Sequence, residues 1–134
     1  MKNHPLGNLA EQTGALYGDL WHRYTDEGFT HSVSLIYDRM TANSFDFDLI
    51  KSRECIDLGC GGGRGTALML ELGAEHVTAV DISKTGLSDA AKRLRSYENV
   101  NFVRSSCLAL EFPDHTFDFA WCSGVLHHTE APEQ

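Results

Sequence analysis

The hydrophobic and polar positions follow two different periods along the chain, and the change falls close to residue 54. Before it, apolar residues recur every three or four positions, a spacing that is typical of amphipathic helices. The first stripe consists of Leu9, Thr13, Leu16 and Leu20, and the second of Val33, Ile36, Tyr37 and Met40. We therefore expect an N-terminal helical extension over residues 1–50.

After residue 54 the apolar residues form short runs that are rich in β-branched or aromatic side chains. Four of these runs predict strands, at residues 55–58, 77–80, 100–103 and 117–122. Helical patterns separate the first three strands, at residues 66–72 and 87–94, and Ser83 is placed to cap the second of them. This alternation predicts an α/β domain over residues 51–134 with a parallel sheet, whose ligands bind beyond the carboxyl ends of the strands.

Length and composition favour a single domain that acts on a small molecule. The 134 residues are 42% hydrophobic, enough for a core, and carry a formal net charge of -8, whereas nucleic-acid binders need a basic face. No apolar run is long enough to span a membrane and the N-terminus lacks a signal-peptide pattern, so we expect a cytoplasmic protein. Because no CxxC pair occurs, the cysteines are expected to be buried, reduced thiols rather than zinc ligands or disulfides: Cys55, Cys60, Cys107 and Cys122.

A glycine-dense turn directly follows the first predicted strand. Its alternating residues Gly59, Gly61 and Gly63 allow a tight turn and let a ligand lie against bare backbone. Close packing of the strand against the next helix is the alternative explanation. Arg64 stands where a dinucleotide fingerprint would need its third glycine, and no Gly-Lys-Ser/Thr sequence follows. The turn is therefore neither a clean NAD motif nor a phosphate-binding P-loop.

Two acidic residues accompany this turn. Asp57 precedes Gly59 by two positions and is expected to point toward the ligand crevice, where it would repel a pyrophosphate and attract an ammonium group. Asp81 ends the second strand, where a carboxylate can accept hydrogen bonds from both ribose hydroxyls. A helix cap is the alternative role of Asp81, because Ser83 and a predicted helix follow it. The combination with the glycine turn favours a nucleoside that carries a cationic amino-acid moiety.

Four motifs in chain order resemble those of class I S-adenosylmethionine-dependent methyltransferases, most closely the small-molecule type 11 group that includes ubiquinone-biosynthesis methyltransferases. They are Asp57-x-Gly59-x-Gly61-x-Gly63, Val77–Ser83, Leu110–Asp118 and Val125–His128. The resemblance covers residues 54–134. It implies a Rossmann-like sheet in a three-layer αβα arrangement, incomplete here, with the N-terminal helices as a lid. It also implies S-adenosyl-L-methionine as cofactor and in-line methyl transfer to a small-molecule acceptor.

The resemblance assigns roles to individual residues. Asp57 and the glycine loop would face the methionine part of the cofactor, Asp81 would hold the ribose, and Ile82 would pack on adenine. Ser106 and Cys107 stand where the family usually has an Asp for the adenine amino group and a backbone N–H for the ring. The implied cofactor-binding residues are Asp57, Gly59, Cys60, Gly61, Gly63, Asp81, Ile82, Ser106, Cys107 and Ser123.

No catalytic residue is assigned. His127 and His128 would border the substrate side, where an imidazole can act as a general base, with packing as the alternative. Adjacent histidines on a helix point about 100° apart, so no metal site is expected. Tyr17 or Tyr24 could close the cofactor site.

The chain departs from the family in length, because it stops at Gln134 where the family continues with three further strands. We therefore expect an open apolar edge on the fourth strand, including Trp121, through which copies of the chain self-associate. A truncated module that binds the cofactor or a partner protein without methyl transfer remains an alternative. A fragment of an NAD-binding oxidoreductase is opposed by Arg64 and Asp57.

Overall fold

A parallel four-stranded sheet forms the centre of the protein. In the computed structural model, which describes residues 8–23 and 25–123, the strands lie in the order β3-β2-β1-β4. They are β1 (Glu54–Leu58), β2 (His76–Asp81), β3 (Val100–Arg104) and β4 (Phe119–Trp121). All four predicted strands are present, and β1 lies inside the sheet. The α/β fold class is confirmed.

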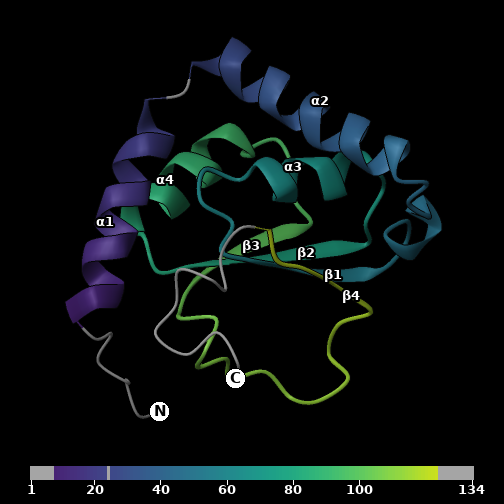
Figure 1. Cartoon of the computed structure of the whole chain (residues 1–134). Coiled ribbons are helices and arrows are strands. Elements are labelled where there is room, and N and C mark those ends of the chain that lie inside the picture. The colour runs from purple at the N-terminus through teal and green to yellow at the C-terminus, as the bar shows by residue number, and fades with distance from the viewer. Residues whose placement is uncertain (1–7, 24, 124–134) are drawn as a thin grey trace.

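Helices cover one face of this sheet. α3 (Arg64–Glu71) connects β1 to β2, and α4 (Lys84–Arg93) connects β2 to β3. α1 (Asn8–His22) packs against α4, and α2 (Asp26–Ala42) packs against α3. The connection from β3 to β4 runs along the opposite face of the sheet without a helix of its own (Figure 1). The described residues thus form a Rossmann-like sheet with helices on one side.

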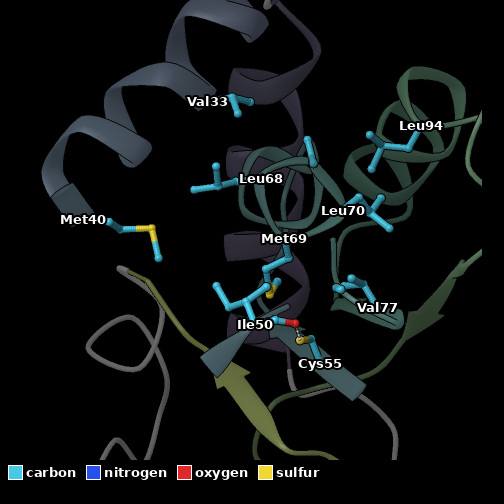
Figure 2. Close-up of a cluster of buried hydrophobic side chains, with 11 residues drawn as sticks. Val33, Met40, Ile50, Cys55, Leu68, Met69, Leu70, Val77 and Leu94 are labelled. Carbon is cyan, nitrogen blue, oxygen red and sulfur yellow. Dashed lines mark hydrogen bonds between the residues drawn. The ribbon is translucent and has the colours of Figure 1, made fainter. Parts of the chain in front are cut away.

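The N-terminal extension shares a core with the sheet. Val33 and Met40 of α2 point toward α3, and Ile50, which is fully buried, lies between them and the start of β1 (Figure 2). The short 3-10 helix η1 (Phe47–Leu49), which the sequence analysis did not predict, leads the chain into Ile50. The residues that pack here belong to one buried cluster: Val33, Met40, Ile50, Cys55, Ala67, Leu68, Met69, Leu70, Ala74, Val77 and Leu94.

The buried face of α1 differs from the predicted stripe. Leu16 is 62% exposed, whereas Gly14 is buried. A Cβ built on Gly14 would lie 3.0 Å from Cγ1 of Ile82, so a side chain here would require Ile82 to shift. The helix therefore turns its glycine, rather than its leucine, toward the domain, and the expectation for Leu16 was wrong. His22 at the end of α1 adds a contact, with Nδ1 2.9 Å from Oδ2 of Asp89 on α4.

β4 is the edge strand of the described sheet, as expected, but its aromatic side chains are half-buried rather than open to solvent. β4 pairs with β1 in parallel, and its other edge has no strand partner among the described residues. Phe119 and Trp121 are half-buried and pack against the core cluster, with the Phe119 ring 5.9 Å from that of Phe45. Ala120, between them, is exposed. The two aromatic residues alternate with Ala120 and thus point to the helix-covered face.

Two further observations bear on the expectations from composition. None of the four cysteines forms a disulfide within the described residues; Cys55 and Cys60 are buried, but Cys107 is half-buried and Cys122, which follows the last residue of β4, is exposed. Within residues 8–23 and 25–123, no helix combines the length and apolar character needed to cross a bilayer.

Candidate functional site

The glycine turn between β1 and α3 lies at the carboxyl end of the sheet. Gly59, Gly61 and Gly63 have φ values of 74°, 53° and 92°. Residues that carry a side chain rarely adopt such positive φ values. Gly63 also serves as the N-cap residue of α3, and a Cβ on it would lie 3.0 Å from Cβ of Ala90 on α4. The alternating glycines are therefore required by backbone conformation and, at Gly63, by helix packing as well.

Most backbone N–H groups of this turn already donate to acceptors within the protein. Those of Gly59 and Cys60 both donate to the carbonyl oxygen of Val80, at 2.7 and 2.9 Å. The N–H of Gly61 donates to Oδ2 of Asp81 at 2.8 Å, and that of Gly63 donates to the carbonyl of Cys60 at 2.9 Å. A pyrophosphate site needs several free N–H donors that point at the ligand. This turn offers bare backbone surface instead.

Asp81 connects the glycine turn to the start of α4. Its Oδ2 accepts from Gly61, and its Oδ1 accepts from the N–H of Ser83 at 2.7 Å. The hydroxyl of Ser83, not the carboxylate of Asp81, caps α4 by accepting from the N–H of Gly86 at 3.0 Å. Burial raises the pKa of Asp81, although the backbone hydrogen bonds of Ser83, Gly61 and Ile82 oppose the shift. Each carboxylate oxygen keeps a lone pair with which it can accept a further hydrogen bond.

Asp57 lies beneath the turn and is only 2% exposed. Its Oδ2 accepts from the hydroxyl of Thr66 at 2.7 Å. Burial raises its pKa from 3.8 to about 6, and the hydrogen bonds from Thr66 and the charge of Arg64 lower it, while Asp81 raises it further. The site thus places two interacting carboxylates near the glycine turn, with Asp57 buried and Asp81 half-buried.

The remaining predicted residues lie at the same end of the sheet or next to it. Ile82 follows β2, is half-buried, and packs against Gly14 of α1. Cys107 is half-buried and its pKa is raised by burial and by the nearby Asp81, so the segment after β3 approaches Asp81. Ser106 uses its hydroxyl oxygen to accept from the N–H of Leu108 at 3.1 Å. Ser123, two residues after β4, is exposed.

Sequence reasoning missed two residues at this site. Thr66 was read only as part of a helix, yet its hydroxyl contacts Asp57. Trp121 was placed on an open edge, yet its indole nitrogen lies beside Gly65: a Cβ built there would be 2.9 Å from Nε1 and 3.0 Å from Oδ2 of Asp57. Trp121 comes close to Asp57 because the two residues are register partners in the pairing of β4 with β1. A single sequence does not reveal that register.

Some predictions fall on residues outside the described ranges. The histidines at 127 and 128 and the tyrosine at 24 belong to this group, so their proposed roles stay predictions. Tyr17 is half-buried on α1. No group of three or more His, Cys, Asp and Glu side chains in the described part of the chain is arranged to hold a metal ion.

The architecture defines an α/β protein of the Rossmann-like class, and in such sheets ligands generally bind at the carboxyl ends of the strands. Residues 56–134, more than half of the chain, match the family model Methyltransf_11, described as "Methyltransferase domain". The chain belongs to this methyltransferase family.

Individual relatives agree with this membership. The ubiquinone biosynthesis O-methyltransferase of Schizosaccharomyces pombe, a mitochondrial protein, is 34% identical over 106 residues, which cover 69% of this chain and 38% of the relative. The 27-O-demethylrifamycin SV methyltransferase of Amycolatopsis mediterranei is 26% identical over 131 residues, covering 92% of this chain and 48% of the relative. The chain therefore spans between about a third and a half of the length of these relatives.

A solved structure shows the same fold. The S-adenosylmethionine-dependent methyltransferase from Mesorhizobium loti is 30% identical and superimposes with a TM-score of 0.55 over 60% of this chain and 37% of that chain.

Proposed function

We propose that this chain binds S-adenosyl-L-methionine and forms the cofactor-binding part of a methyltransferase that acts on a small molecule. One observation carries the proposal: a glycine turn whose amides are mostly occupied within the protein lies close to two carboxylates, Asp57 and Asp81. Such a turn suits a ligand that is cationic and lies flat on backbone. It does not suit the pyrophosphate of a dinucleotide.

The methionine part of the cofactor lies on the glycine turn in this proposal. Gly59, Cys60, Gly61 and Gly63 provide a backbone surface without side chains in the way, except for the thiol of Cys60, which is buried. The negative charge of Asp57 favours the ammonium group of the amino-acid moiety. Ser123, exposed at the end of β4, is in the segment that would approach the same moiety.

The adenosine part extends along the edge toward β3. Each carboxylate oxygen of Asp81 accepts one backbone hydrogen bond, from Gly61 or from Ser83. The remaining lone pairs accept hydrogen bonds from the two ribose hydroxyls in this proposal. Ile82 packs on one face of the adenine ring, and Ser106 and Cys107 meet its amino edge. Gly14 of α1 packs against Ile82, so α1 lies next to this site. In this proposal α1, with Tyr17, forms part of its wall or lid.

When bound, S-adenosyl-L-methionine supplies a methyl group that is activated by a sulfonium centre. This methyl group would be available for in-line transfer to a lone pair of the acceptor, with Asp57, Asp81 and the glycine turn as the residues that would hold the cofactor. The chain contributes by holding the reacting atoms in line, which raises the rate without a dedicated catalytic residue. We therefore assign no catalytic residue within the described ranges.

The acceptor is a small molecule in this proposal. The relatives named above carry ubiquinone-biosynthesis and rifamycin names, both of which refer to small-molecule acceptors. The formal net charge of -8 opposes binding to a phosphate backbone. None of the four cysteines forms a disulfide within the described residues, which suits the reducing cytoplasm, where we place the protein.

Isothermal titration tests the proposal. S-adenosylmethionine and its demethylated product, S-adenosylhomocysteine, are expected to bind, whereas NADH is not. Tight binding of NADH with no heat from either sulfur compound would refute it. A screen with radiolabelled cofactor then separates an active methyltransferase from a module that binds the cofactor without transferring the methyl group.

A further inference from the structure

Thr66, in the first turn of α3, contacts Asp57 through two of its groups. Its hydroxyl donates to Oδ2 at 2.7 Å, and its backbone N–H also lowers the pKa of this carboxyl. Thr66 is 0% exposed and Asp57 is 2% exposed. Water therefore has little room to replace the hydroxyl, and the removal of this donor would leave a buried charge poorly compensated.

The charged and titratable groups around Asp57 make this donor important. Arg64 at the start of α3 favours the ionised carboxylate, whereas Asp81 at the end of β2 opposes it. The thiol of Cys60 has a pKa well above its usual value, because of burial first and the nearby carboxylates second, so it carries no charge. Trp121, the register partner from β4, contributes no charge either. Arg64 and the two groups of Thr66 thus favour the ionised form of Asp57, whereas burial and the second carboxylate, Asp81, oppose it.

Packing leaves the carboxylate little freedom to turn away from Thr66. A Cβ built on Gly65 would lie 3.0 Å from Oδ2 of Asp57 and 2.9 Å from Nε1 of Trp121. The oxygen is thus enclosed between the backbone of α3 and the indole ring of β4. Its charge reaches the glycine turn through the protein interior, where electrostatic interactions are stronger than in water.

We propose that Thr66 is a positioning residue for cofactor binding: its hydroxyl holds Asp57 fixed and ionised beneath the glycine turn, so that the carboxylate attracts the ammonium group of the bound cofactor. The inference rests on the proposed function, in which the amino-acid moiety of the cofactor lies on that turn. Asp57 acts here as a buried charge rather than through an exposed hydrogen-bonding atom, because almost none of its surface is accessible.

Two measurements on Thr66→Val test the proposal. Valine keeps the shape of threonine and removes the hydroxyl. Carbon-13 NMR follows the titration of the Asp57 carboxyl without ligand, and calorimetry gives the affinity for S-adenosylhomocysteine between pH 5.5 and pH 8.5. Because a hydrogen bond to a charged group is lost, we expect the Asp57 midpoint to move to higher pH and the affinity at pH 7 to fall about tenfold. At pH 8.5, where Asp57 is ionised again, most of the loss should disappear.

Three variants serve as controls. Thr66→Ser keeps the hydroxyl and should restore both the midpoint and the affinity. Thr78→Val removes another buried hydroxyl, which donates to Asn101 at 3.1 Å on β3, and should leave both unchanged. Thr66→Ala replaces the valine variant where that variant does not fold.

The two readouts keep this inference separate from the proposed function. An unchanged Asp57 midpoint in the valine and alanine variants, or an affinity loss of equal size at every pH, would show that Thr66 is only structural and would overturn the inference. A shifted midpoint in a protein that does not bind S-adenosylhomocysteine would refute the proposed function, and with it the cofactor role of Thr66.

Discussion

Asp81 and Gly61 lie 20 positions apart and are joined by a hydrogen bond of 2.8 Å, from the N–H of the glycine to Oδ2 of the aspartate. The bond ties the glycine turn after β1 to the end of β2. The other oxygen of Asp81 accepts from the N–H of Ser83, so the same side chain also fixes the start of α4. A single carboxylate therefore holds together the two connections that shape the proposed cofactor site, and its loss should affect both.

Replacement of Asp81 by alanine should weaken the binding of S-adenosylmethionine about ten- to a hundredfold. The expected loss is about 1.5 to 3 kcal/mol, because hydrogen bonds to a charged acceptor are removed. Calorimetry measures the dissociation constant. Asp118→Ala is the matched control, because Oδ2 of Asp118 also accepts from a backbone N–H, that of Glu54 at 3.0 Å, but at the opposite end of the sheet. Equal affinities for the Asp81 variant and the wild type would leave Asp81 a purely structural role.

The exchange Ser106→Asp should tighten cofactor binding about two- to tenfold. It supplies a charged acceptor for the adenine amino group, where the serine hydroxyl already accepts from the N–H of Leu108. The same exchange at Ser105, whose hydroxyl donates to the carbonyl of Ala109, serves as the control and should bring no gain. Weaker binding by the Ser106 variant would indicate that adenine lies elsewhere.

The free energy of unfolding should decrease as the pH rises from about 4 to about 6. Burial raises the pKa of Asp57 from 3.8 to about 6, so in this range the folded state holds a proton that the unfolded state has released. The shift corresponds to a loss of up to about 3 kcal/mol, and the raised pKa of Asp81 acts in the same direction. Urea unfolding at a series of pH values measures it.

Asp57→Asn should remove most of this pH dependence and should be more stable than the wild type at pH 7, while it binds the cofactor less well. Asp48→Asn, at an exposed position, changes the net charge equally and should retain the slope. A slope that survives in the Asp57 variant would assign the effect to other groups.

Self-association through β4 is expected to be weak, because it relies on backbone pairing alone. Phe119 and Trp121 face the core, and Ala120 is the exposed residue of the strand. Sedimentation at increasing concentration should reveal an oligomer that Ala120→Lys suppresses, since a charge on an edge strand opposes pairing. Leu16→Lys, at an exposed apolar residue of α1, should not suppress it. A monomer at all concentrations would contradict the prediction.

The sequence by itself determined the order of the elements, the parallel sheet and the position of the glycine turn. These features depend on local patterns: apolar runs at residues 55–58 and 77–80, the cap at Ser83, and glycines at alternate positions, of which Gly59, Gly61 and Gly63 all have positive φ. The family motifs lie in the same segments. Local chemistry therefore sufficed to place Asp57 and Asp81 at the carboxyl ends of β1 and β2.

Only the tertiary structure decided what surrounds these carboxylates. The pairing of β1 with β4 sets Trp121 beside Asp57, and the close approach of α3 to β1 gives Asp57 its hydrogen bond from Thr66. Likewise Gly14, which no helical stripe marks, lets α1 approach Ile82 while Leu16 stays exposed. Such contacts depend on strand register and on the distance between packed elements, and neither is encoded in the periodicity of a single segment.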